Sequence, residues 1–209
     1  TDEPKEKASA HEAWLAGLTE DVIEPELPIV DPHHHLWVRN GVPYLLRELV
    51  ADLETGHNIV ATVFAECHSM YRPFGPQAFR AVGESEFVAG IAAMSESGSF
   101  GESRACAVSF GGADLTLGEA VEEVLEAHRI ASGGRFRGVR YSTGWDPSEK
   151  IRNVAPEPHM LRDPRVRAAL GVLQRLGLSF DSWLYHPQLE EIAEVAEAFP
   201  DLTIVLNHV

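Results

Sequence analysis

The segment Leu27–Trp37, L-P-I-V-D-P-H-H-H-L-W, decides the expected fold of this chain. Its apolar start predicts a β-strand over Leu27–Asp31, and a run of histidines follows at the carboxyl end of that strand. Side chains alternate along a strand, so His33 and His35 are expected to point to one side and His34 to the other. Two imidazoles on one side of a strand end can bind one metal ion or polarise one carbonyl group.

The rest of the chain repeats this alternation of apolar runs with helical patterns. Apolar residues recur at a helical spacing from Leu117 and again from Leu189, and Asp163-Pro164 and His186-Pro187 predict helix starts, because proline fits the first turn of a helix. Strands that alternate with helices indicate a parallel sheet. The further predicted strands are Ile59–Glu66, Phe87–Met94, Phe136–Tyr141, Leu178–Tyr185 and Leu202–His208.

Polar residues at the ends of these strands favour a barrel over a doubly wound sheet. Catalytic groups from many strand ends are typical of a (β/α)8 TIM barrel, and no glycine-rich phosphate loop follows the first strand. The polar ends are Asp31–His35, Glu66–His68, Arg140-Tyr141, Asp181–His186 and Asn207-His208.

The expected fold is therefore an α/β chain that forms an incomplete TIM barrel. We expect about six β/α units, with the last two strands absent from the chain, since a complete barrel has eight. Residues 27–209 would form this partial catalytic domain. Residues 1–26 would form a polar extension that is partly helical around Ala8 to Leu18.

Composition restricts the partners that the chain is expected to have. The net charge of the 209 residues is −15, which argues against nucleic acid and against anionic membrane surfaces. The two cysteines, Cys67 and Cys106, have no C-x-x-C spacing and so predict neither a disulfide framework nor a thiolate zinc site. We expect a cytoplasmic protein that acts on a small anionic molecule, and a homo-oligomer remains open.

Five further polar residues are candidates for substrate binding. Glu66 and His68 share one side of the second strand end, where they could bind metal or substrate, or simply pair with each other. Arg140 could clamp a substrate carboxylate through two parallel hydrogen bonds, or pair with a structural acid. Asp181 and His186 follow the fifth strand, although His186 could instead cap the next helix.

Five segments, taken in barrel order, resemble the amidohydrolase superfamily. The resemblance is to its amidohydrolase-related (amidohydrolase 2) branch, which includes sugar lactonases, pyrone-dicarboxylate hydrolase and metal-dependent decarboxylases. It covers the chain from about Pro28 to its end. The segments are Asp31–Trp37, Ala65–Arg72, Phe136–Tyr141, Phe180–Leu189 and Ile204–Val209.

The resemblance implies catalytic and metal-binding roles for three histidines. His33 and His35 match the pair of the first strand, and His208 matches the histidine that ends the sixth. The fourth-strand lysine of two-metal members has no counterpart, so the chain is expected to hold one divalent ion at most, with zinc the first choice, or to act without metal. The branch often has aspartate before its sixth-strand histidine, where this chain has Asn207, and the aspartate of the eighth strand has no position here.

The expected function is the opening of a lactone derived from a sugar acid or from aromatic catabolism. Water would attack a carbonyl that histidines or a metal ion polarise. One alternative is a metal-dependent decarboxylase of an aromatic or dienoate acid, which would share the barrel and its histidines. A second alternative is a non-catalytic, degenerate barrel, and the retained His33, His35 and His208 argue against it.

Overall fold

Six parallel strands form one curled sheet, in which every strand lies beside its neighbours in the chain. The computed structural model describes residues 10, 13–15, 17 and 20–208. The strand order is sequential, and each strand pair of this sheet is parallel. A doubly wound sheet, in which the strand order reverses, is therefore excluded, and a half-barrel of the TIM type is confirmed. The strands are β1 (Ile29–His34), β4 (Ile59–Ala65), β5 (Arg104–Gly112), β6 (Phe136–Ser142), β7 (Ser179–Trp183) and β8 (Ile204–Asn207).

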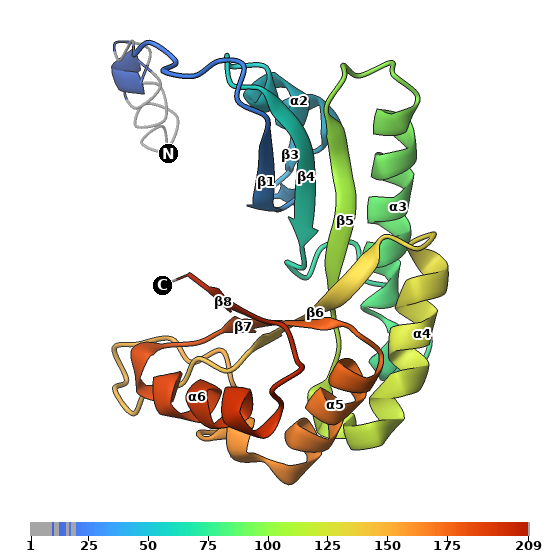
Figure 1. Cartoon of the computed structure of the whole chain (residues 1–209), viewed down its shortest axis with the longest axis vertical. Helices are drawn as coiled ribbons and strands as arrows, with labels where there is room; N and C mark the ends of the chain where they lie inside the picture. The colour runs from blue at the N-terminus through green and yellow to red at the C-terminus, as the bar shows by residue number, and fades with distance from the viewer. Residues whose placement is uncertain (1–9, 11–12, 16, 18–19, 209) are drawn as a thin grey trace.

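Helices connect these strands and cover the outer side of the curl (Figure 1). The helix start expected at Asp163-Pro164 is confirmed, because the Asp163 carboxylate accepts the backbone N–H of Arg165 and caps the first turn. The start expected at His186-Pro187 is found as a short 3-10 turn that leads directly into a helix. The α-helices are α2 (Leu46–Leu53), α3 (Val82–Glu96), α4 (Val121–Ala131), α5 (Pro164–Arg175) and α6 (Leu189–Ala198). The 3-10 helices are η1 (Gln77–Phe79), η2 (Leu115–Ala120), η3 (Met160–Arg162) and η4 (His186–Gln188).

The third strand lies elsewhere than the sequence predicted. The apolar run Phe87–Met94 belongs to helix α3, and the strand in this place is β5. A continuous apolar run does not distinguish a buried helix from a buried strand. β5 in turn is rich in small residues, because larger side chains would clash with their neighbours. A Cβ on Gly112 would meet the Tyr71 hydroxyl at 2.5 Å, and one on Gly111 would meet the His128 ring at 2.9 Å.

A small hairpin follows the histidine segment and was not predicted. Strands β2 (Trp37–Arg39) and β3 (Val42–Tyr44) pair antiparallel across Asn40 and Gly41, which both adopt positive φ, at 53° and 77°. Such a turn favours Asn-Gly, so the signal was present in the sequence. The hairpin places the Trp37 ring 5.4 Å from the ring of His35 and so adds an aromatic neighbour to the histidines.

The buried apolar residues form two clusters along the curl. One includes Leu46 and Phe64 in the first part of the chain, and the larger includes Leu125 and Phe180 in the second part. Both lie where helices pack on the sheet, as expected for β/α units that bury one face of each helix. The helix expected around Ala8 to Leu18 falls mostly outside the described residues, of which residues 10 and 13–15 are helical.

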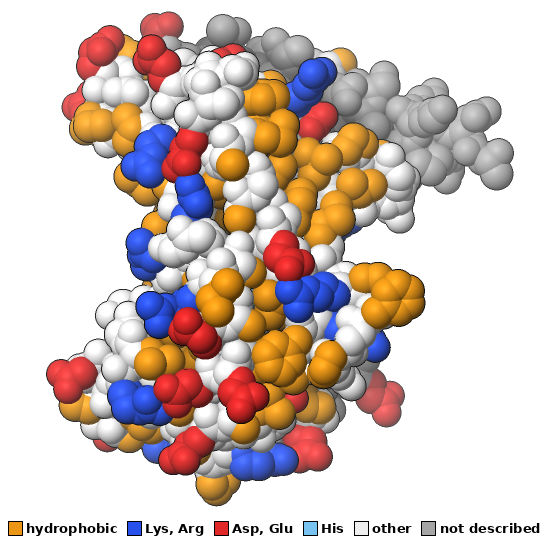
Figure 2. Space-filling view, turned by 90° about the vertical axis from the view of Figure 1, so that its right-hand side faces the viewer, with side chains coloured by type: hydrophobic (Ala, Val, Ile, Leu, Met, Phe, Trp, Pro, Cys, Tyr) orange, Lys and Arg blue, Asp and Glu red, His pale blue; other side chains and the backbone are white. Residues whose placement is uncertain are grey.

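The helix-covered face carries acidic and basic side chains side by side (Figure 2). Ion pairs account for part of this pattern: Arg129 contacts Glu126 within α4 at 2.9 Å, and Arg175 of α5 contacts Glu122 of α4 at 2.8 Å. Exposed pairs of this kind contribute about 1 kcal/mol or less to stability. Across the described part of the chain, the helices are too short or too polar to cross a lipid bilayer.

Candidate active site

Three histidines from the two outermost strands converge at the carboxyl side of the sheet, as the sequence predicted. His33 lies on β1, His35 directly after it, and His208 directly after β8. The Nε2 atoms of His33 and His35 are 3.1 Å apart, and the ring centroids of His33 and His208 are 5.0 Å apart. β1 and β8 end opposite edges of the sheet, so the curl of the half-barrel is what brings these rings together. We call His33, His35 and His208 the histidine cluster.

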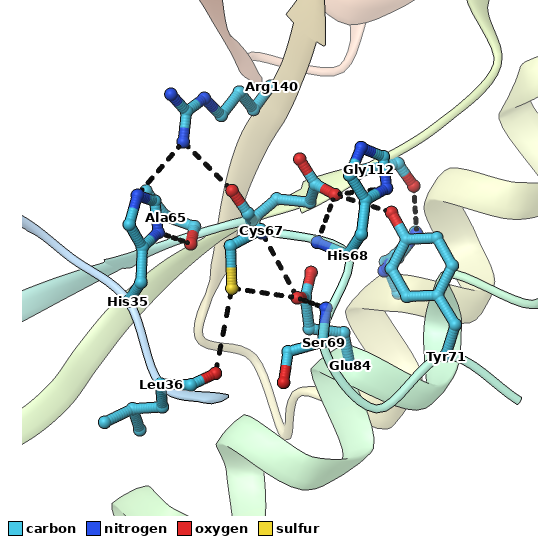
Figure 3. Close-up of polar contacts among 12 residues, drawn as sticks. His35, Leu36, Ala65, Cys67, His68, Ser69, Tyr71, Glu84, Gly112 and Arg140 are labelled. Carbon is cyan, nitrogen blue, oxygen red and sulfur yellow. Dashed lines mark hydrogen bonds and ion pairs between the residues drawn. The ribbon is translucent and has the colours of Figure 1, made fainter. Parts of the chain in front are cut away.

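Arg140 of β6 places its guanidinium against the histidine cluster. Its Nη2 donates to His208 Nε2 at 2.8 Å. Its Nη1 donates to the backbone oxygen of Glu66 at 3.0 Å and lies 3.5 Å from His35 Nε2 (Figure 3). The residue is only 8% exposed, and its Nε has no hydrogen-bond partner in the described residues. A buried cation therefore lies between two of the three rings.

Asp181 and Asn207 complete the charged side of the site. Asp181, on β7, is 3% exposed, and its Oδ1 lies 3.7 Å from Arg140 Nε. Its two carboxylate oxygens accept from Asn207 Nδ2 at 3.0 and 2.7 Å. Burial raises the pKa of Asp181, and the Asn207 amide and the Arg140 guanidinium oppose that rise. The acid that partners Arg140 is thus itself part of the site.

Glu66 and His68 pair with each other beside the histidine cluster. Glu66 is buried; its Oε1 lies 3.1 Å from His68 Nδ1 and accepts from the Tyr71 hydroxyl at 2.7 Å, while the His68 side chain is exposed. Buried Glu84 of α3 holds the same loop by accepting the backbone N–H of Ser69 at 2.7 Å. The geometry supports the pair that the sequence allowed, and it joins both residues to the wall of a cavity.

This cavity has a volume of about 850 Å³ and opens at the carboxyl ends of β4, β5 and β6. That volume is suited to a small organic molecule. Glu66 and His68 line it, and Arg140 lines it while also contacting the histidine cluster. Polar and apolar side chains form the rest of the wall. The polar ones include Arg80, Asp114 and Tyr141, and the apolar ones include Ala78, Leu117 and Val154.

The structure does not place His186 with the other candidates. It is exposed at the start of η4, and it makes none of the contacts that join the other candidates among the described residues. It begins the η4 turn but does not cap it, because the N-cap residue of η4 is Tyr185 and that of α6 is Gln188. The proline that follows it fits the first turn.

Burial and the nearby cation keep the histidine cluster uncharged at neutral pH. Burial, followed by the charges of His35 and Arg140, lowers the pKa of His33 to about 4. Burial also lowers the pKa of His35 and of His208, and Arg140 adds to the effect on both. Neutral imidazoles can accept a proton from water or donate an N–H to a carbonyl, so the cluster is suited to either task.

The donor atoms do not fit a metal ion held by all three histidines. The 3.1 Å between His33 Nε2 and His35 Nε2 is close to the spacing of two neighbouring ligands, given metal–nitrogen bonds of about 2.0–2.1 Å. His208 Nε2, however, faces the Arg140 guanidinium, and a cation and a metal ion do not share one lone pair. Within the described residues, no group of three or more His, Cys, Asp or Glu side chains has the arrangement to hold an ion.

Sequence reasoning assigned no role in the site to two residues that shape it. Asn207 was named as a polar strand end and as a departure from the aspartate of the lactonases, yet it bonds to both His33 and Asp181. Tyr71, for which the sequence favoured loop packing over pocket lining, bonds to Glu66 and lines the cavity. The signal for Asn207 was its place one residue before His208, and the signal for Tyr71 was its place in the segment Ala65–Arg72.

Comparison with known proteins gives one family match and several distant relatives. Residues 30–209 match the model of the Amidohydrolase family (Amidohydro_2). An uncharacterized protein of Sinorhizobium fredii, y4mH, is 28% identical over 205 residues, which cover 88% of this chain and 62% of the relative.

Among solved structures, the chain is similar to an amidohydrolase from Burkholderia multivorans. One crystal form of that enzyme contains bound zinc (15% identity, TM-score 0.56) and another bound Hepes (17% identity, TM-score 0.56). These matches cover 85% and 86% of this chain and 56% of the solved chain. The chain thus spans little more than half the length of the proteins it matches, and at such identity the likeness shows the fold alone.

Proposed function

The chain belongs to the amidohydrolase family, and from this premise we propose that it carries the active site of a hydrolase that opens a lactone by attack of water on the carbonyl carbon. The observation that carries the proposal is the position of Arg140. It contacts the histidine cluster on one side and lines the cavity of about 850 Å³ on the other. A substrate in that cavity would meet a buried cation and neutral imidazoles together.

Arg140 supplies the electrostatic stabilisation in this proposal. A substrate oxygen that accepts from Nη2 would take the place of His208 Nε2, which now accepts that hydrogen bond at 2.8 Å. The negative charge that develops on the carbonyl oxygen would then lie beside a desolvated cation, where its stabilisation is strong. The same guanidinium would recognise the carboxylate of an anionic lactone, because its planar donors match a carboxylate.

His208 supplies the base. Once Arg140 turns to the substrate, the lone pair on His208 Nε2 is free to accept a proton from the attacking water, and the low pKa of the ring keeps it neutral beforehand. The water oxygen bonds to the carbonyl carbon, the acyl C–O bond breaks, and the leaving alkoxide takes the proton from His208. The product is a hydroxy acid that ionises at neutral pH.

Water is a better nucleophile for this site than either cysteine. Burial raises the pKa of Cys67 and of Cys106 to about 12, so neither thiol forms a thiolate at neutral pH. Cys106 also lies buried beside His34, at 3.8 Å, on the other side of β1 from His33 and His35. This supports direct hydrolysis over a covalent intermediate. We propose further that the reaction needs no resident metal, since the cation at the site is Arg140.

The test is a pH-indicator screen of the complete protein against sugar lactones, muconolactones and pyrone carboxylates, with CO₂ release from aromatic acids followed in parallel. Acid release from a lactone, lost in the His33→Ala, His35→Ala double variant, is the expected result. His57→Ala is the matched control, because this exposed histidine precedes β4 at the opposite end of the half-barrel. CO₂ release with no lactone opened would assign the protein to the decarboxylases instead.

A further inference from the structure

We propose that Asn207, held by Asp181, is a positioning residue that fixes His33 as the tautomer with its proton on Nε2. His33 and His35 then form a hydrogen bond with each other and do not act as a pair of metal ligands. The inference concerns the protonation pattern of the site and does not depend on the identity of the substrate. It follows from four contacts: Asp181 with Asn207, Asn207 with His33, His33 with His35, and His35 with Ala65. None of these residues lines the cavity.

The first step is the orientation of the Asn207 amide. One terminal atom of this amide lies 2.7 and 3.0 Å from the two oxygens of Asp181 and 3.0 Å from His33 Nδ1. A carboxylate only accepts hydrogen bonds, so the atom that faces it is the NH₂ nitrogen. Arg140 Nε, 3.7 Å from Asp181 Oδ1, favours the ionised carboxylate at this position.

The second step assigns the proton of His33. One N–H of Asn207 is used by Asp181, and the other points at His33 Nδ1. A nitrogen that accepts a hydrogen bond carries no proton of its own, so the proton of a neutral His33 ring is on Nε2. A second proton on Nδ1 would point at the N–H of Asn207 across 3.0 Å, so the ring is neutral.

The third step assigns the proton of His35 independently. His35 Nδ1 lies 2.8 Å from the backbone oxygen of Ala65, which only accepts, so this nitrogen is the donor. Its Nε2 is therefore a bare lone pair, 3.1 Å from the N–H of His33 Nε2. Donor meets acceptor, and one hydrogen-bonded chain runs from Asp181 through Asn207, His33 and His35 to Ala65.

This chain disfavours a metal ion on the pair. A metal ligand must present a lone pair, so His33 Nε2 would have to pass its proton to Nδ1. That nitrogen already faces the N–H of Asn207, and two N–H groups would then point at each other at 3.0 Å. A residue that accepts at position 207, such as aspartate, would favour the opposite tautomer and leave two lone pairs facing each other across 3.1 Å.

The experiment combines ring-nitrogen NMR with zinc titration. Long-range ¹H–¹⁵N spectra of the histidine-labelled chain should show the proton of His33 on Nε2 and that of His35 on Nδ1. The swap variant, Asp181→Asn with Asn207→Asp, keeps the hydrogen bond between the two residues but exchanges donor and acceptor. It should move the His33 proton to Nδ1 and bind Zn²⁺ roughly 10- to 100-fold more tightly, the usual effect of partners behind a ligand.

Asn153→Asp is the matched control and should change neither readout. The side chain of the exposed Asn153 makes hydrogen bonds only to the backbone of Asp146 in the described residues. A wild-type His33 with its proton on Nδ1 would overturn the proposal. Equal zinc affinity for the wild-type chain and the swap variant would do the same. If the swap variant does not fold, the wild-type spectrum and the single variant Asn207→Asp decide the matter by the same criteria.

Discussion

The histidine cluster and the buried His128 carry the same type of side chain with similarly lowered pKa values, yet the two regions differ in what the rings contact. Burial lowers the pKa of His128 to about 4, as it does for His33. His128 Nδ1 contacts the Ser85 hydroxyl at 2.8 Å, its Nε2 contacts the Gly112 oxygen at 3.0 Å, and its ring stacks on Phe136.

Every polar atom of His128 thus has a fixed partner inside the layer between helix and sheet, and this histidine serves the fold. The rings of the histidine cluster contact one another and a guanidinium that lines a cavity, and we propose that they serve catalysis. The difference teaches that a shifted pKa alone does not mark a functional histidine. The hydrogen-bond partners of each ring nitrogen distinguish a histidine of the fold from a candidate histidine of the site.

The strongest test of this contrast replaces the histidines of each region. His33→Ala with His35→Ala should lower kcat for lactone opening by at least about 10²–10³-fold, because residues at the carboxyl ends of barrel strands serve function more than stability. His128→Ala should instead lower the free energy of unfolding by about 3 kcal/mol, since it leaves a cavity and unpaired polar groups. Activity assays and chemical denaturation of both variants measure this. The contrast fails if the double variant unfolds while His128→Ala stays as stable as the wild type.

Arg140 offers the next largest effect. Arg140→Ala should raise KM about 10- to 100-fold for a lactone that carries a carboxylate, and much less for a neutral lactone, because a charge-assisted hydrogen bond contributes about 1.5–3 kcal/mol. Arg140→Lys keeps the charge but loses the planar fork, so it should restore only part of the difference. The ratio of KM values for the two substrates is the measurement. An equal change for both would remove the role in carboxylate recognition.

The pH dependence of stability tests the role of His128 in the fold. His128 has a folded-state pKa near 4 and an unfolded value near 6.5, so the unfolded chain binds more protons between these values and stability falls as the pH drops through this window. His128→Gln, which can still contact Ser85 and Gly112, should reduce the loss between pH 7 and pH 5 by roughly 2 kcal/mol. Denaturant titrations at the two pH values test it. An unchanged loss in the variant would contradict the assignment.

Tyr71→Phe should have the smallest effect. The change removes one hydrogen bond to the buried Glu66 at the cavity wall, and it leaves the histidine cluster untouched. We expect a loss of about 1 kcal/mol in stability and a change in rate of only a few fold. A loss of activity as large as that of the double variant would place Tyr71 in the catalytic step and would move the centre of the site into the cavity.

The sequence predicted most of the fold from the alternation of strands and helices, and it failed where local signals were ambiguous. The run Phe87–Met94 is apolar throughout, although Gly90, Ala93 and Met94 are exposed, and an unbroken apolar run lacks the periodicity that marks a helix. β5 has the small residues that close packing against Tyr71 and His128 requires, and they lack the β-branched pattern of a strand.

For the site, the sequence indicated which residues lie at strand ends, but it did not indicate which residues form hydrogen bonds with one another. The place of His33, His35 and His208 at strand ends sufficed to predict that they converge, since parallel strands bring their carboxyl ends to one edge. Asp181 and Asn207 lie on the paired strands β7 and β8, and the curl of the sheet brings Asn207 to His33 on β1, far away in the sequence.

The most direct measurement of the central claim is the rate of lactone opening by the complete protein after exhaustive removal of divalent metal. If Arg140 and the histidine cluster carry the reaction, the metal-depleted enzyme should keep its kcat, and added Zn²⁺ should change it by less than about twofold or inhibit it by competing for the imidazoles. Loss of activity on depletion, with full recovery on addition of one equivalent of Zn²⁺, would contradict the account.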